Sequence, residues 1–168
     1  MILDQLWLDG MLIMNKIMFS MIALSLMLSA CAKTKEDALI SFKQNKSTYV
    51  VIVEQLRLFP KIKTINPNLK KTGLSETTGF DKQTLDIYDQ LMTKAKNIDL
   101  ASIQAIRDKS GSELEGVSFA IPYGLDASKL IDIIYVSQGQ KVEDFYPDET
   151  VCEIIDSPSW YLCVTDNR

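Results

Sequence analysis

The chain has 168 residues, a formal net charge of −4 and 46% apolar residues. The apolar residues are unevenly distributed, because 22 of them and six of the seven methionines lie within residues 1–31. Without this block, 137 residues remain, which is enough for one compact domain with a single core. Their 17 basic and 20 acidic side chains argue against a general nucleic-acid-binding protein.

The chain contains no histidine, which excludes Ser-His-Asp and Cys-His nucleophile systems and the usual histidine-containing zinc sites. It also lacks a Ser-x-x-Lys motif, a glycine-rich phosphate loop and a Cys-x-x-Cys motif. Carboxylates, Lys, Tyr and Cys remain as candidates for catalysis, but the sequence singles out no glycosidase-type pair among the carboxylates. We therefore assign no catalytic residue, no metal ligand and no cofactor.

Residues 14–32 have the layout of a secretory signal. Lys16 precedes an uncharged stretch, residues 17–32, which is shorter than the roughly 20 residues that a membrane-spanning helix needs. Within it, Leu28-Ser29-Ala30-Cys31 resembles the lipobox of bacterial lipoproteins. The resemblance implies that a diacylglycerol is attached to the sulfur of Cys31, that the chain is cut before this residue and that the new amine is acylated. The alternative is a simple signal peptide, or an uncleaved anchor, that happens to end in cysteine.

Two or three acyl chains would hold the domain on a membrane stably, since each buried methylene contributes about 0.8 kcal/mol. Ala32 follows the cysteine, whereas an aspartate there favours inner-membrane retention in enterobacterial lipoproteins. The resemblance therefore implies an anchor in the outer membrane facing the periplasm, with the inner membrane and the cell surface as alternatives.

The expected domain organisation follows from this signal. Asp4 and Asp9 carry negative charge where such signals are positive, so we interpret residues 1–13 as an upstream extension from a mis-assigned start. The remaining segments are a signal peptide at 14–30, a lipidated tether at 31–35 and a single α+β domain at 36–168.

Two helices are predicted in the first half of this domain. Thr34 and Asp37 form a capping-box-like pair before an apolar pattern with spacings of three and four, which predicts a helix over about 36–58 that ends before Pro60. Asp81 precedes a second pattern, which predicts a helix over about 82–97.

Short β-rich runs dominate the second half. The predicted strands are 102–108, 117–122, 129–137, 150–155 and 160–165, with one further short strand considered around 62–65. The run 129–137 is apolar on both sides, so we expect it to be central and covered on both faces. The sequence thus predicts an α+β fold, with two N-terminal helices packed on an antiparallel sheet of about four to five strands that ends in a disulfide-linked hairpin.

The last two cysteines flank the loop of the final predicted hairpin. If Ile155 faces Trp160, then Cys152 faces Cys163, at a separation that a disulfide can span. An exported protein meets an oxidising compartment, so we predict a structural disulfide. A redox pair is the alternative, but the spacing is not that of a redox motif.

Three weaker signals remain. Residues 32–71 carry a net charge of +6 and residues 72–168 one of −9, so the basic segment either contacts anionic headgroups or, as we favour, is a solvated face. The acidic run 143–149 offers oxygen ligands to calcium but lacks the alternating aspartates of a calcium loop, so we favour a solvated loop. Phe145, Tyr146, Trp160 and Tyr161 form a candidate partner patch, with a core role as the favoured alternative.

These features together favour a non-enzymatic, lipid-anchored envelope protein of binding or accessory type. Its expected partners are the membrane, through the lipid on Cys31, and a protein of the envelope, while no nucleic acid is expected. An immunity protein or inhibitor is one specific version of this hypothesis, although no motif supports it. A carboxylate-based envelope hydrolase and a small-molecule-binding lipoprotein are the alternatives.

Overall fold

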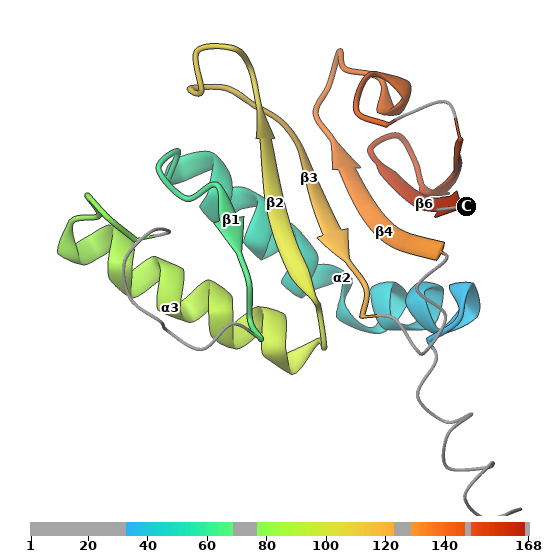
Figure 1. Cartoon of the computed structure of the whole chain (residues 1–168), viewed down its shortest axis with the longest axis horizontal. Coiled ribbons are helices and arrows are strands. Elements are labelled where there is room, and N and C mark those ends of the chain that lie inside the picture. The colour runs from blue at the N-terminus through green and yellow to red at the C-terminus, as the bar shows by residue number, and fades with distance from the viewer. Residues whose placement is uncertain (1–32, 69–76, 123–128, 147–148, 167–168) are drawn as a thin grey trace, which may run out of the picture. The chain divides into compact units, whose positions relative to one another are not determined.

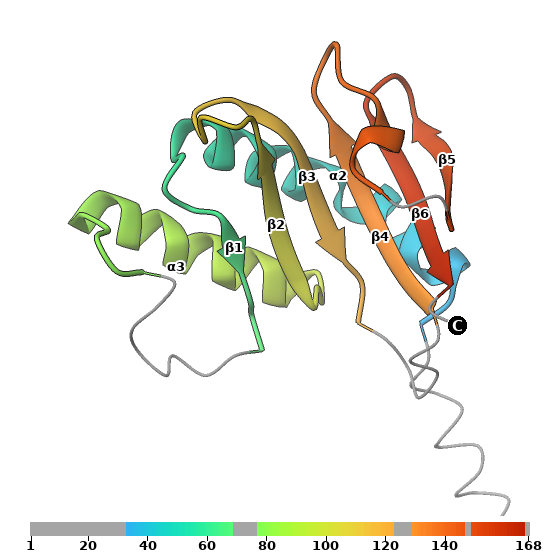
Figure 2. The same cartoon turned by 45° about the horizontal axis from the view of Figure 1, so that its top comes forward.

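The computed structural model describes residues 33–68, 77–122, 129–146 and 149–166. Within these ranges, two α-helices lie on one face of a six-stranded antiparallel sheet (Figures 1 and 2). The predicted α+β class is confirmed. The predicted upstream extension, signal peptide and lipidation site at Cys31 lie outside the described residues.

Helix α2 (Lys35–Leu58) begins at the predicted capping box. The Thr34 hydroxyl accepts a hydrogen bond from the Asp37 amide at 3.2 Å, and the Asp37 carboxylate accepts one from the Thr34 amide at 2.8 Å. The hydrogen bonds that the amide and the hydroxyl of Thr34 donate to the Asp37 carboxylate lower the pKa of Asp37. The helix is kinked at Asn45, whose side-chain amide donates to the Ser41 carbonyl at 2.9 Å. The buried face consists of Ala38, Phe42, Tyr49, Ile52, Val53 and Leu56.

Helix α3 (Lys82–Asn97) has the predicted bounds. Its N-cap is Asp81, whose carboxylate accepts a hydrogen bond from the Thr84 amide at 2.8 Å, which lowers the pKa of Asp81. The helix packs beside α2 and against strand β1. Its buried residues, Thr84, Tyr88, Leu91, Met92 and Ala95, lie on the side that meets the core.

The sheet has the strand order β1-β2-β3-β4-β6-β5, with every neighbouring pair antiparallel. Its strands are β1 (Thr64–Ile65), β2 (Ser102–Arg107), β3 (Leu114–Ala120), β4 (Lys129–Val136), β5 (Thr150–Asp156) and β6 (Trp160–Asp166). The predicted number of strands, four to five, is wrong, because the sheet has six. The sixth strand is β1, a two-residue edge strand that pairs with Gln104 and Ile103 of β2 and is too short to produce a clear alternation.

Strand β4 lies between β3 and β6, so it is central as predicted, but only its second half is covered on both faces, because Leu130 and Asp132 line an open groove. Ile131 and Ile133 point to the helices and belong to the main core. Ile134 and Val136 point to the opposite face, where they pack with Val142 from the short 3-10 helix η1 (Val142–Asp144). The connection between β4 and β5 therefore covers part of the face that the helices leave open (Figure 2).

The hairpin of β5 and β6 contains the predicted disulfide. Cys152 pairs with Cys163, and their sulfur atoms are bonded, with the Cα atoms 4.1 Å apart. The predicted pairing of Ile155 with Trp160 is wrong, because Asp156 pairs with Trp160 and the register shifts between Ile154 and Asp156. Such a bulge adds one residue to one strand, and it leaves the pairing at the cysteines as predicted.

Candidate functional site

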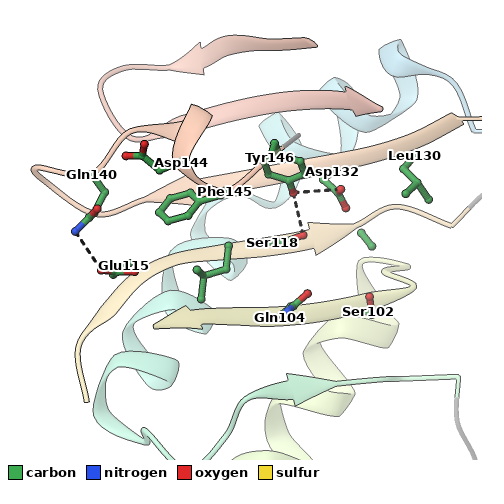
Figure 3. A pocket seen from close by; sticks show the side chains of 12 residues that line it. Ser102, Gln104, Glu115, Ser118, Leu130, Asp132, Gln140, Asp144, Phe145 and Tyr146 are labelled. Atoms are coloured by element: carbon green, nitrogen blue, oxygen red, sulfur yellow. Dashed lines mark hydrogen bonds between the residues drawn. The ribbon is translucent and has the colours of Figure 1, made fainter. Parts of the chain in front are cut away.

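The sheet face opposite the helices contains a groove of about 750 Å³ (Figure 3). Strands β2, β3 and β4 form its floor, and the segment around η1 forms one wall. The lining residues are Ser102, Gln104, Ile106, Glu115, Ser118, Ala120, Leu130, Asp132, Gln140, Asp144, Phe145 and Tyr146. Most are polar, in contrast to the apolar core on the other side of the same strands.

The polar floor follows from the alternation of side chains along the strands. In β2, Ile103 points into the core, while Ser102 and Gln104 line the groove. In β3, Phe119 points into the core, while Ser118 lines the groove. Two neighbouring strands therefore present short hydroxyl and amide side chains on the face that no helix covers.

Asp132 of β4 lies in the floor of this groove. The Tyr146 hydroxyl donates a hydrogen bond to Oδ2 of Asp132 at 3.2 Å and lies 3.5 Å from Oγ of Ser118 (Figure 3). Burial raises the pKa of the Asp132 carboxyl, while hydrogen bonds from Tyr146 and Ser118 act in the opposite direction. Asp132 is thus a half-buried carboxyl with polar partners, placed where a bound molecule would touch it.

Phe145 forms the wall next to Tyr146, and its position depends on Gly116 of β3. A Cβ atom at Gly116 would lie 2.9 Å from the Tyr135 carbonyl oxygen and 3.2 Å from Cε2 of Phe145. Any side chain at this position would therefore push the aromatic ring or the adjacent strand away. Glycine allows the Phe145 ring to rest directly on the sheet backbone.

The carboxylates of the groove are spread along it. Glu115, whose carboxylate accepts a hydrogen bond from Gln140 at 3.4 Å, lies with Asp144 near one end, and Asp132 lies near the other (Figure 3). Asp132 pairs with Ala120, and Glu115 lies five positions before Ala120 in β3, which is about 16 Å along a regular strand. This exceeds the roughly 5–10 Å between paired glycosidase carboxylates. The groove lining contains no Lys or Arg among the described residues.

Three residues of the predicted partner patch, Phe145, Tyr146 and Tyr161, pack on the same small apolar cluster, whereas Trp160 belongs to the core on the other face of the sheet. Phe145 and Tyr146 line the groove. Trp160 is only 5% exposed and points to the helix side, where its ring packs on Phe42 at a centroid distance of 5.1 Å. Tyr161 packs against the small apolar cluster under η1, and its hydroxyl donates to the Pro158 carbonyl at 3.3 Å.

Of the acidic run, Glu143, Asp144 and Glu149 are exposed, and residues 147–148 lie outside the described ranges. No group of three or more potential ligands that could hold a metal ion occurs among the described residues. Cys152 and Cys163 are bonded to each other beside the apolar cluster under η1.

Sequence reasoning missed Asp132, Ser118 and Gln104. One signal was available, because Asp132 is the only charged residue between Leu130 and Val136 in a strand that is otherwise apolar on both sides. A carboxyl in such a position either has buried partners or lies in a cavity. The partner, Tyr146, is 14 residues away in sequence, and only the path of the β4–β5 connection brings it there.

Comparisons with known proteins place the chain in no family, since no family model, no curated protein and no solved structure matches it. Neither of the two helices in the described ranges has both the length and the apolar character to span a bilayer.

Proposed function

We propose that the protein is a non-catalytic, lipid-anchored binding protein of the bacterial envelope, and that the groove is its binding site. The observation that carries this proposal is the position of Asp132 in the groove floor, with Tyr146 above it. A buried carboxyl destabilises a fold unless it is fully satisfied, so such groups concentrate at functional sites. An apolar residue at position 132 would suit the strand better, which favours a role in binding.

The form of the groove favours an extended, hydrogen-bonding segment of an envelope protein as the ligand. Ser102, Gln104 and Ser118 offer donors and acceptors in rows along neighbouring strands, and Phe145 and Tyr146 add aromatic surface. Aromatic side chains that are partly buried beside polar groups are common anchors of protein interfaces. An immunity protein or inhibitor that captures a segment of its target is the specific version that we retain.

The alternative of a carboxylate-based hydrolase has less support. Asp132 lies about 16 Å along the sheet from Glu115, too far for these two to act as acid and base or nucleophile on the same bond. Asp144 lies at the same end of the groove as Glu115, but it is exposed. A small-molecule ligand is the other alternative, since Ile106, Ala120 and Leu130 lie in the groove floor beside its polar side chains.

Site-specific photo-crosslinking on bacterial membranes tests this proposal. A photoreactive amino acid replaces Gln104, which is exposed in the groove, or Leu85, which is 39% exposed on the helical side. We expect a discrete crosslinked protein from position 104 that is absent from position 85 and that is lost in an Asp132→Asn background. The same products from both positions, or products that persist in the Asp132→Asn background, would contradict binding in the groove.

The lipid anchor is tested separately. Intact-mass measurement on the membrane fraction is expected to show an N-terminus at Cys31 that carries acyl chains, and Cys31→Ser is expected to release the protein from membranes. Wild-type protein without acyl chains would refute the anchor and leave the crosslinking result unaffected.

A further inference from the structure

The two edges of the sheet differ in length. Edge strand β1 has two residues, whereas edge strand β5 has seven and, among the described residues, pairs with β6 alone (Figure 2). The backbone of an edge strand can pair with another chain, and proteins usually block such an edge with a short strand, lysine or proline. Strand β5 contains neither lysine nor proline, and its bulge lies near its end, at Ile155. The edge at β5 is therefore open to a further strand.

The disulfide identifies the backbone groups of β5 that point outward. Opposed residues of an antiparallel pair have Cα atoms about 5.5 Å apart where they exchange hydrogen bonds and about 4.5 Å apart where they do not. The Cα atoms of Cys152 and Cys163 are 4.1 Å apart, so this pair is not hydrogen-bonded. The backbone N–H and C=O groups of Thr150, Cys152 and Ile154, which alternate with the bonded positions, therefore point away from β6. A further strand would bond to these groups.

Two exposed aliphatic side chains border this edge, one on each face of the sheet. Val151 is 74% exposed and lies on the helix side, as Glu153 does, which pairs with Lys35 of α2. Ile154 is 63% exposed and lies on the groove side with Cys152. A strand added to the edge would cover part of both side chains. The disulfide already holds β5 in its extended form, which lowers the entropic cost of adding a strand.

We propose that a second copy of this chain pairs with β5, so that the two sheets join across a two-fold axis at Cys152. In this antiparallel register Thr150 of each copy lies opposite Ile154 of the other, and Cys152 lies opposite its own counterpart. The outward backbone groups of all three residues are then paired, and Val151 lies opposite Glu153 of the second copy. A register centred on Glu153 would instead oppose two glutamates directly, which like-charge repulsion disfavours. This inference goes beyond binding in the groove and does not depend on it.

The start of helix α2 favours a second copy as the occupant. Lys35, the first residue of α2, lies 2.7 Å from Glu153 (Nζ to Oε2), so the helix begins beside the paired edge. The two-fold axis is perpendicular to the joined sheet, which keeps the helices of both copies on one face and the start of each α2 near the axis. Because Cys31 stands only four residues before Lys35 in the sequence, the lipids proposed for both copies can enter one bilayer. Confinement to a membrane raises the local concentration of the chain, so that even a weak edge pairing is populated.

Photo-crosslinking of the full-length protein on bacterial membranes tests this pairing. A photoreactive amino acid replaces Val151 at the edge or, as a control, Leu85 on α3, which is 39% exposed. We expect position 151 to give a covalent dimer of this chain, joined to residues 149–156 of the second copy, and position 85 to give none. Dimer from both positions, no dimer from position 151, or a product from position 151 that contains a different protein would overturn the proposal.

Two matched replacements at Ile154 test whether the backbone of β5 makes the contact. Ile154→Pro removes an N–H that points outward and leaves the bonds to β6 in place, whereas Ile154→Val keeps this N–H. The yield of dimer from position 151 should fall at least roughly tenfold with proline, because each copy loses a hydrogen bond, and should stay near the wild-type yield with valine. Equal yields in the two variants would overturn the proposal. If Ile154→Pro does not fold, Thr150→Pro replaces it, because proline is tolerated at the first residue of a strand.

Discussion

The two faces of the sheet are built from the same strands but differ in composition. On the helix side, side chains from α2, α3 and the strands form one continuous apolar core, in which the rings of Phe42, Tyr49, Phe119 and Trp160 contact one another. On the other side, the described residues form a small apolar cluster around Ile134, Val142 and Cys163, and a groove in which polar side chains alternate with Ile106, Ala120 and Leu130.

This difference separates the residues that stabilise the fold from those that are free to serve a function. Burial of an apolar side chain contributes roughly 1.5–3 kcal/mol, so the helix side supplies most of the stability. Replacements in the polar groove change little apolar burial. Variants on the helix side should therefore lower the free energy of unfolding, whereas variants in the groove should mainly weaken binding.

Phe119→Ala is expected to have the largest effect. The side chain is fully buried, and its ring lies 4.9 Å from that of Tyr49. Truncation of a buried phenylalanine removes apolar burial and leaves a cavity, so the free energy of unfolding should fall by about 3–5 kcal/mol in urea titrations. Leu130→Ala, at a 40% exposed position on the groove side, is the control and should stay within about 1 kcal/mol of wild type. Similar losses in both variants would remove the distinction between the faces.

The double replacement Cys152→Ala with Cys163→Ala should cause the second largest loss of stability. The disulfide closes a loop with a sequence separation of 11 residues, and loss of this constraint on the unfolded chain should cost about 3 kcal/mol. Thermal unfolding of the oxidised and reduced wild type gives an independent measure of the same loss. If reduction leaves the midpoint unchanged, the bond contributes nothing to the stability of the hairpin.

Gly116→Ala should have a smaller effect that is centred on the groove. The new methyl group would meet the Tyr135 carbonyl oxygen and the Phe145 ring, and overpacking of this kind costs about 1–3 kcal/mol. Ser118→Ala on the same strand and face adds no atoms and is the control for the stability measurement alone, because its hydroxyl belongs to the groove. Crosslinking from position 104 should also weaken in Gly116→Ala, because Phe145 must move. Unchanged stability and crosslinking would show that the Phe145 wall plays no part in binding.

The helices and most strands could be predicted because their signals are local. Thr34 and Asp81 cap the two helices as their sequence context indicates, and turn residues separate the strands. The pairing of Cys152 with Cys163 followed from counting residues outward from one loop. The bulge at Ile155 could not be predicted, because one extra residue in a strand leaves the apolar pattern nearly unchanged.

The groove could not be predicted, because it depends on which face of the sheet the β4–β5 connection covers. Asp132 stood out in its strand, but its contact with Tyr146 exists only after the β4–β5 connection folds back over β4. The charge asymmetry was visible in the sequence, yet its structural meaning was not. Two lysines of the basic helix α2 form ion pairs with Glu153 and Asp156 of the acidic hairpin, which lies more than 100 residues further along the chain.

Asp132→Asn should change stability least, and it should raise the melting temperature, whereas the other variants lower stability. Burial raises the pKa of the Asp132 carboxyl in the folded protein above its ordinary value of 3.8, so the folded state binds more protons than the unfolded state between these two pKa values. Stability from this group is therefore present at low pH and is lost as the pH rises through the folded pKa. Asparagine stays neutral and can still accept the hydrogen bond from Tyr146, so the variant should unfold at a higher temperature than wild type at pH 7.

The gap in melting temperature between Asp132→Asn and wild type should close as the pH is lowered, because Asp132 then becomes protonated. Asp144→Asn, at an exposed position in the same groove, is the control and should leave the melting temperature unchanged. A lower melting temperature for Asp132→Asn at pH 7, or a gap that is independent of pH, would contradict the argument. A variant that is more stable yet no longer crosslinks from position 104 would show that the protein keeps an ionised Asp132 for binding, at the expense of its own stability.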